Sequence, residues 1–317
     1  MSDVSKLLIR CSQVLLLVIL MVGIVFLTLH LDKQHLYQAS LLKEKLLADT
    51  PAPRIIIFGG SNIAFGIDSE LMERELGLPV INDGLHVGLG IAPLTEIKNY
   101  LQPGDIIIIS LEYYNFTDKT SLYGQPQYLA DWIEISPNRI WDIRDPIREM
   151  PTIYTIMLQR KINRQIQNYL YGDSLDISRG FYTGDKFNDH GDFIGHLGHN
   201  NNLHFEVDDS IYPISNLDEA YKVLESFNQF ALSKGARVFY EAQAHRQTNC
   251  ERTGRKNIKS FFSRLKNKTS IPLLTDLNRI CLPDNYFYDT PYHLNEQGRE
   301  VRTERLIESL KSALGRQ

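Results

Sequence analysis

The stretch that decides the fold is IIIFGGSNIAFGID, residues 55–68. Four large apolar residues run into two glycines, a serine and an asparagine, and then into a helix start capped by Asp68. An apolar run without polar alternation indicates a strand covered on both faces, as in a parallel sheet. Ligands gather beyond the carboxyl ends of such strands, so Ser61 is a candidate nucleophile, and Asn62 is expected to assist an anion there. The alternatives for Ser61 are a phosphate-binding serine and an ordinary turn serine.

Strands and helices alternate on both sides of this stretch. The pattern predicts these elements in turn: a helix over 68–76, a strand over 78–83, a helix over 93–101, a strand over 104–110, a helix over 217–234, a strand over 236–242, a helix over 255–266, a short strand over 271–275 and a helix over 296–314. The economical arrangement is an α/β fold with one doubly wound, flavodoxin-like, mostly parallel sheet. Residues 117–213 break the rhythm and are predicted to form a helical and loop insertion.

Composition excludes one class of partner. The chain has 317 residues and a net charge of −4 at pH 7, and its lysines and arginines are scattered along it. A nucleic-acid binder carries a basic patch or stripe, which this sequence lacks. We therefore expect no nucleic-acid partner, and we expect no cofactor.

The N-terminus is unusually apolar. No charged residue occurs from Cys11 to Leu31, a length that suits a bilayer core of roughly 30 Å. We predict a cytoplasmic N-terminus over 1–12, a transmembrane anchor over 13–31, an amphipathic stalk over 32–53 and a domain over 54–317. A cleaved signal peptide is the alternative, but the apolar run is longer than usual for one and no cleavage site follows it.

The charges that flank the predicted anchor indicate its orientation. Lys6 and Arg10 precede it, whereas Asp32 and Lys33 largely cancel after it. By the positive-inside rule the N-terminus stays in the cytoplasm, and the domain faces the extracytoplasmic, periplasmic side. The membrane is thus the first partner that we expect.

Two cysteines lie in the exported part of the chain. Cys250 and Cys281 are an even number that an oxidising compartment allows to pair, whereas Cys11 lies at the membrane edge. A disulfide and two unpaired thiols both remain open from the sequence.

A serine nucleophile needs a base from elsewhere in the fold. Among the nine histidines, His293 lies in YFYDTPYHLNEQG, just before the amphipathic C-terminal helix, where a loop reaches the same edge of the sheet as Ser61. Asp289, four residues upstream, is positioned to hold the imidazole in the tautomer that accepts the serine proton. The alternative for Asp289 is a surface residue of the turn.

Three motifs together resemble one family. FGGSN (58–62), NDGLHVG (82–88) and YDTPYHLNEQG (288–298) resemble blocks of the SGNH/GDSL hydrolases, in particular membrane-anchored members associated with bacterial cell-envelope acylation. The resemblance covers 54–116 and 217–317 and leaves the insertion unexplained. It implies an SGNH-type sheet and places the nucleophile on Ser61, the base on His293 and the acid on Asp289.

The chain departs from the family pattern at three positions. Gly60 stands where the family has the aspartate of Gly-Asp-Ser, and Thr290 stands three residues before His293, where the acid is usual. The Gly-x-Asn-Asp block is absent, so Glu112 or Asn115 is the candidate for the role of its asparagine in the oxyanion hole.

Backbone amides are the other candidates for the oxyanion hole. The expected donors are the amide of Ser61 and a glycine amide of the second block, for which Gly88 fits the spacing better than Gly84.

The insertion contains FNDHGDFIGHLGHNNNLHFEVDD, residues 187–209, which is rich in histidine and aspartate. The residues that raise a metal site are His190, His196, His199 and His204, with Asp189 and Asp192. Their spacing lacks the fixed geometry of His-Glu-x-x-His, so we predict a solvated loop or an active-site lid and no metal.

Together these features predict a membrane-anchored serine esterase or O-acyltransferase. It would act through an acyl-serine on ester-linked acyl groups, with a cell-envelope polysaccharide as the expected carrier. The alternative is a catalytically silent protein of SGNH fold that binds glycan or docks a membrane acyltransferase.

Overall fold

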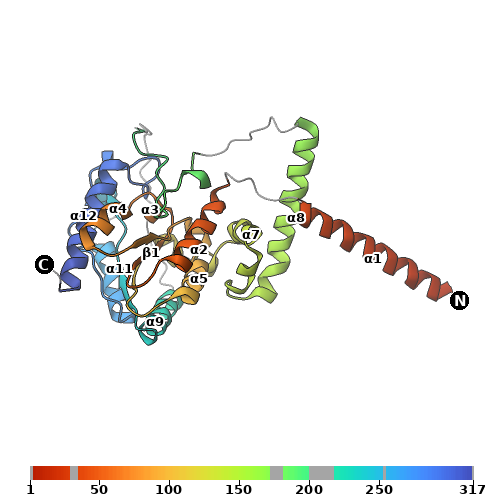
Figure 1. Ribbon diagram of the computed structural model, residues 1–317, viewed down its shortest axis with the longest axis horizontal. Helices are drawn as coiled ribbons and strands as arrows, with labels where there is room; N and C mark the ends of the chain where they lie inside the picture. Colours follow the sequence, from red (N-terminus) through yellow and green to blue (C-terminus); the bar gives the residue numbers. More distant parts are fainter. Residues whose placement is uncertain (1–2, 29–34, 172–180, 200–217, 253–254, 316–317) are drawn as a thin grey trace.

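The computed structural model describes residues 3–28, 35–171, 181–199, 218–252 and 255–315. It is a mixed α/β structure with a four-stranded parallel sheet in the order β2-β1-β3-β4, and Figure 1 shows helices on both sides of this sheet. The strands are β1 (Ile55–Gly59), β2 (Val80–Asn82), β3 (Ile106–Ser110) and β4 (Arg237–Tyr240).

The five helices predicted with bounds are present in the predicted order, and further helices accompany them. The helices are α1 (Asp3–Thr28), α2 (Ala39–Asp49), α3 (Ser61–Ala64), α4 (Ser69–Leu76), α5 (Ala92–Tyr100), α6 (Lys119–Tyr123), α7 (Pro126–Ile135), α8 (Pro146–Tyr171), α9 (Asp218–Ser233), α10 (Gln247–Arg252), α11 (Arg255–Lys268) and α12 (Glu296–Ala313). The predicted ones are α4, α5, α9, α11 and α12. Short 3-10 turns add η1 (Leu36–Gln38), η2 (Val87–Leu89), η3 (Tyr113–Phe116), η4 (Pro137–Trp141), η6 (Gly184–Lys186) and η8 (Asp284–Tyr286).

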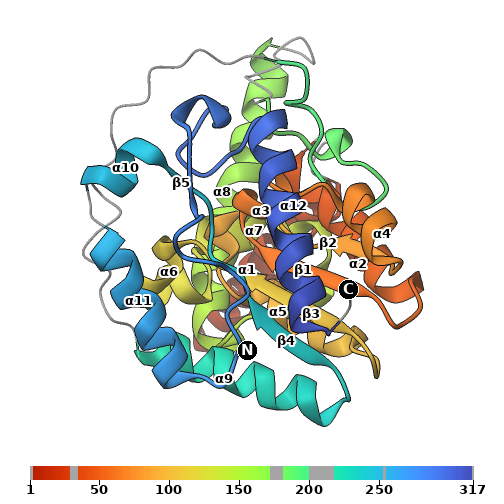
Figure 2. The same cartoon turned by 90° about the vertical axis from the view of Figure 1, so that its left-hand side faces the viewer.

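The strands are buried on both faces because their side chains alternate between two apolar layers. Ile56 and Phe58 of β1 join a cluster with α5, α9 and α11, whereas Ile55 and Ile57 join a cluster with α4 and α12. Figure 2 shows α12 running along one side of the sheet, with α9 and α11 at its β4 end. This double cover explains why the strands are continuous apolar runs.

The late part of the chain completes the same sheet, as predicted. β4 pairs with β3 in parallel, with Ile106 opposite Arg237 and Ile109 opposite Tyr240. The predicted strand over 271–275 is wrong: it forms only an isolated bridge between Tyr240 and Leu273. Pro272 has no N–H to donate to a ladder, so pairing stops there.

The helix α4 begins and ends as its sequence predicts. The Asp68 side chain accepts a hydrogen bond from the Leu71 amide at 3.1 Å, and Gly77 ends the helix with a left-handed φ of 65°. These are an N-cap and a glycine C-cap of the usual kind.

The segment predicted to be a stalk is instead part of the domain. Residues 39–49 form α2, which lies against α5 and β2. Leu47 is buried in the main core, and the buried Lys43 ammonium donates to the carbonyl oxygens of Asn82 and Gly191 at 2.6 and 2.7 Å. The helical spacing of the leucines predicted the helix, but it does not show the surface of the domain on which the helix packs or the two carbonyl groups that accept from Lys43.

The N-terminal helix α1 extends over most of the predicted cytoplasmic segment and of the predicted anchor. In the described ranges, no helix combines the length and the apolar character needed to cross a membrane. Residues 29–31 of the predicted anchor lie outside the described residues.

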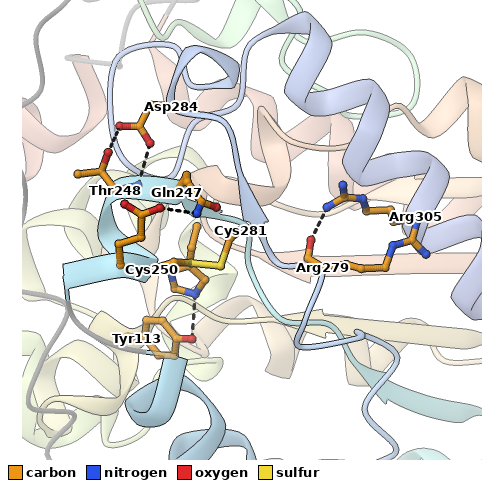
Figure 3. Close-up of a disulfide and its surroundings, with 10 residues drawn as sticks. Tyr113, Gln247, Thr248, Cys250, Arg279, Cys281, Asp284 and Arg305 are labelled. Carbon is orange, nitrogen blue, oxygen red and sulfur yellow. Dashed lines mark hydrogen bonds between the residues drawn. A yellow bond between two sulfur atoms is a disulfide. The ribbon is translucent and has the colours of Figure 1, made fainter.

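A disulfide joins Cys250 of α10 to Cys281, which answers the question that the sequence left open. Cys281 begins β6 (Cys281–Leu282), which pairs in parallel with β5 (His245–Arg246). Figure 3 shows the bond beside Tyr113, whose hydroxyl lies 3.0 Å from Nε2 of His245. The disulfide therefore holds a small second sheet next to the loop that follows β3.

Candidate active site

Ser61 begins α3 directly after the two glycines that end β1. The strand end has no room for side chains: a Cβ on Gly59 would lie 2.6 Å from the carbonyl oxygen of Ser110 on the neighbouring strand. Ser61 itself is buried. A close approach of two backbones is the physical reason for glycine at this position.

Asn62 holds the turn in place. Its Oδ1 accepts the Gly60 amide at 3.1 Å, and its Nδ2 donates to the Ser110 carbonyl at 3.2 Å. Arg302 of α12 reaches the Asn62 carbonyl oxygen at 2.7 Å and forms a buried ion pair with Glu241. The Asn62 side chain is thus engaged in holding the turn, and its assistance to an anion stays a prediction.

His293 and Asp289 are brought together. Nδ1 of His293 lies 2.6 Å from Oδ1 of Asp289. A carboxylate only accepts, so Nδ1 carries the proton and Nε2 is left as an acceptor. Thr290 makes the four-residue spacing possible, because its hydroxyl accepts the amides of Tyr292 and His293 at 3.2 and 3.0 Å. The residue that replaces the usual acid therefore builds the turn.

The imidazole lies on the helix turn that carries the serine. The rings of His293 and Phe65 are stacked with centroids 3.8 Å apart and planes 5° apart. The Phe65 amide in turn donates to the Ser61 carbonyl oxygen at 3.0 Å. Within the described residues no hydrogen bond joins the Ser61 hydroxyl to the His293 ring. Bonds of this kind are often long in unliganded sites and shorten when substrate binds.

Residues 181–199 of the insertion cover this side of the site. Phe181, Tyr182 and Phe193 pack around Phe65 and Tyr288 in one aromatic cluster. The Tyr182 hydroxyl donates to the carbonyl oxygen of Leu85. This part of the predicted lid is an apolar cover over the His293 ring.

Asp192 fastens the cover to the domain. Its carboxylate accepts from Ser69 Oγ at 2.5 Å, Asn82 Nδ2 at 2.8 Å and Arg299 Nη2 at 2.9 Å. Asp192 is fully buried, and these three donors, which come from other segments of the chain, satisfy its carboxylate. It is a structural residue of the lid.

His196 lies inside the same cover. Its ring packs 4.8 Å from Phe65 and stacks on Phe193, and burial lowers the pKa of His196 to about 3. Neither ring nitrogen has a hydrogen-bond partner among the described residues. His190 and His199 lie in the same ordered segment, whereas His204 lies outside the described residues. In the described part of the chain, no three His, Cys, Asp or Glu side chains gather in a way that could hold a metal ion.

Glu112 lies under the serine turn. Its Oε1 is 3.5 Å from the Asn62 amide and would lie 2.7 Å from a Cβ on Gly60. Burial raises the pKa of Glu112 to about 7, although the Asn62 amide and the charge of Arg302 oppose the shift. A side chain at position 60 would therefore meet the Glu112 carboxyl and, at 3.1 Å, the Val87 backbone, and an aspartate there would set two carboxyl groups against each other.

The other predicted oxyanion groups are occupied. The Gly88 amide donates to Nδ1 of His86 at 3.0 Å, and a Cβ on Gly88 would overlap the Tyr128 ring. Gly84 is pressed against Ile63 of α3. These two glycines serve close contacts and do not present free donors.

Asn115 is also committed to structure. Its Nδ2 donates to the carbonyl oxygens of Val87 and Ser121 at 3.1 and 2.9 Å. The amides of Ser61 and Val87 make no hydrogen bond to another described residue. The Val87 backbone lies 3.1 Å from the position of a Cβ on Gly60. Val87, which the sequence pattern did not indicate, is thus the residue of the second block whose backbone lies against the serine turn.

His86 and Tyr182 connect the second block to the candidate base. Burial, and next the electrostatic effect of His293, lower the pKa of His86 to about 4. Burial raises the pKa of Tyr182 well above its usual range, and the nearby carboxyl groups of Glu112 and Asp289 act in the same direction. The ends of β1, β2 and β3 and the turn before α12 therefore meet in one site.

No protein-family model matches the chain, and none of the curated proteins compared with it is similar in sequence.

Proposed function

We propose that this protein is a membrane-anchored serine esterase or O-acyltransferase that works through an acyl-serine intermediate. The observation that carries the proposal is the pair formed by His293 and Asp289, with the His293 ring stacked on Phe65 in the turn that begins at Ser61. Nucleophile, base and orienting acid from distant parts of the sequence make up the arrangement that acyl transfer requires.

In the acylation step, Ser61 Oγ attacks the ester carbonyl carbon while Nε2 of His293 accepts the hydroxyl proton. The tetrahedral intermediate collapses, the bond to the alcohol oxygen breaks, and His293 returns the proton to that oxygen. In the second step His293 takes a proton from water or from a sugar hydroxyl, which attacks the acyl-serine and releases Ser61 with its proton restored. The acceptor alone distinguishes hydrolase from transferase.

The developing oxyanion needs donors at about 2.7–3.1 Å. In our proposal these donors are the amides of Ser61 and Val87, with the neutral carboxyl of Glu112 as a third group. The raised pKa of Glu112 supports this role, because a protonated carboxyl donates whereas an ionised one repels the oxyanion.

The fold and location belong to the same proposal. The parallel order β2-β1-β3-β4, with helices over both faces, supports a doubly wound arrangement of flavodoxin-like SGNH type. The apolar sequence over 13–31 supports an anchor, and the joined Cys250 and Cys281 support a domain on the oxidising, periplasmic side. Esters carried by a cell-envelope polysaccharide are the substrates within reach from that position.

The test is turnover of a chromogenic short-chain ester by the full chain in detergent. We expect Ser61→Ala and His293→Gln each to lose at least roughly a thousandfold in rate, because these groups act as a unit. Tyr114→Phe, an exposed change on η3, is the control that should keep the activity. Equal rates for wild type and Ser61→Ala would contradict the proposal.

One observation favours the silent glycan-binding or docking alternative. The predicted donors Gly88 and Asn115 are both engaged in structural hydrogen bonds. If the chain only binds glycan, Ser61→Ala will leave binding of an acylated polysaccharide unchanged and no acyl-serine will form with any ester. An acyl group trapped on Ser61 excludes this alternative.

A further inference from the structure

The long helix α8 carries apolar side chains on two faces. One face, with Met150, Ile153 and Met157, is buried against α7. The other face is exposed, and we call it the α8 stripe: Ile147, Ile162, Ile166, Tyr169 and Leu170. The side chains of Ile147 and Tyr169 are 91% and 86% exposed. A contiguous apolar surface with such exposure marks an interaction site.

The α8 stripe has the spacing of a single helix face. Ile166 lies four residues after Ile162, and Tyr169 and Leu170 lie three and four residues after Ile166, which places all four along one side. At 26 residues the helix is about 39 Å long. Trp141, just before α8, adds a further ring that is 76% exposed. Together these side chains form an extended apolar surface.

The position of α1 indicates what lies against this surface. α1 contacts α8, and Figure 1 shows α1 running away from the domain on the side of α8 opposite to the sheet. In the same view, the end of α1 nearer the domain lies beside α8. If α1 enters a bilayer, as proposed, the outer side of α8 therefore comes to the membrane surface.

Residue type fits a lipid surface. The charges of α8 do not add to it, because Arg160, Lys161 and Arg164 are paired with acidic residues of α7 on the side away from the stripe. Trp and Tyr are the aromatic residues that favour the boundary between headgroups and acyl chains. A long exposed apolar face with such aromatic residues is typical of a helix that lies in the membrane interface.

We infer that α8 is an interfacial helix whose stripe rests on a lipid bilayer and holds the domain at a fixed height beside its proposed anchor. The inference rests on the proposed anchoring by α1. It adds a second contact with the membrane, through which the insertion orients the site relative to the bilayer.

The test uses the full chain with Cys11→Ser, so that a single cysteine introduced into the domain takes an environment-sensitive fluorophore. The labelled positions are Ile147→Cys and Ile166→Cys on the α8 stripe, with Leu232→Cys on α9 as the matched exposed apolar control. The proteins are reconstituted into vesicles of phosphatidylcholine and phosphatidylglycerol, with or without a lipid that carries a shallow spin label. Flotation of the vesicles is measured first.

We expect the chain to float, and we expect the shallow spin label to reduce emission from positions 147 and 166 by roughly twofold or more while position 232 is unaffected. Ile162→Glu should abolish the quenching at 147 without preventing flotation. Flotation without quenching at both stripe positions would overturn the α8 contact and leave the anchor standing. A chain that does not float would overturn both. Protection of the stripe only by a second protein in native membranes would contradict the lipid assignment.

Discussion

The His293 ring lies flat on Phe65, with the two ring centroids 3.8 Å apart, and Phe65 is bonded through its amide to the Ser61 carbonyl. This stack links the candidate base to the turn that carries the candidate nucleophile. The base is thus oriented twice, by the Asp289 carboxylate at its edge and by an aromatic face below it.

Phe65→Leu should separate the contribution of this ring to stability from its role in positioning the His293 imidazole. We expect about 1 kcal/mol less stability from the lost stacking, and roughly a tenfold loss of esterase rate because the imidazole is less well positioned. Phe116→Leu, at another fully buried ring in the main core, is the control: it should lose similar stability and keep the rate. Equal effects of both variants on the rate would show that the stack has no positioning role.

Glu112→Gln tests whether a neutral carboxyl serves the site. The pKa of Glu112 is raised to about 7, so the group is neutral below that pH and charged above it. Glutamine stays neutral throughout. We expect the ratio of variant to wild-type rate to rise as the pH rises above about 7, because only the wild type then sets a negative charge beside the oxyanion. The pH profiles of both proteins, with Glu70→Gln as a surface control, measure this. A ratio that stays constant from acid to alkaline pH is the contrary result.

His245→Gln tests a pH dependence of stability. Burial, and next the charge of Arg302, lower the pKa of His245 to about 3 from its usual 6.5. Between these two pH values the unfolded chain therefore binds a proton at His245 and the folded chain does not. The contribution of His245 is therefore complete above pH 6.5 and is lost as the pH falls, by up to about 1.4 kcal/mol per pH unit. Glutamine can still bond Tyr113. Guanidinium unfolding at neutral and mildly acidic pH should show a smaller loss for the variant, and an equal loss would refute the assignment.

Removal of the disulfide should destabilise the fold at the second sheet, where the bond joins α10 to β6. Cys250 and Cys281 are 31 residues apart, for which the loss of chain constraint corresponds to about 3–4 kcal/mol. We expect the double variant Cys250→Ser/Cys281→Ser to unfold at a lower denaturant concentration, with a free energy of unfolding that is lower by about 3–4 kcal/mol. The measurement compares it with the wild type before and after reduction. If reduction leaves the wild type unchanged, the bond does not stabilise the fold.

The strands were predictable because their evidence is local. Isoleucine runs at 55–57 and 106–109 have no polar alternation, and the Asp68 cap and Gly77 stop are read directly from neighbouring residues. The burial of α2 could not be predicted, because Lys43 is satisfied by carbonyl groups that lie 39 and 148 residues further along the chain.

The same distinction applies to the site. Asp289 and His293 are four residues apart, so their pairing could be anticipated from one turn. The surroundings of the candidate oxyanion residues depend on contacts between distant segments: a Cβ on Gly88 would overlap the ring of Tyr128. Likewise, no local signal shows that a side chain at position 60 would meet Glu112 and the backbone of Val87.

The most direct test of the central claim is covalent labelling of the full chain with a fluorophosphonate, followed by mass spectrometry of the peptides. The account predicts one adduct, on Ser61, which forms in the wild type, is lost in Ser61→Ala and slows by at least roughly a hundredfold in His293→Gln. Labelling that is absent from Ser61 under conditions where the protein is folded, or that proceeds equally without the His293 imidazole, would contradict it.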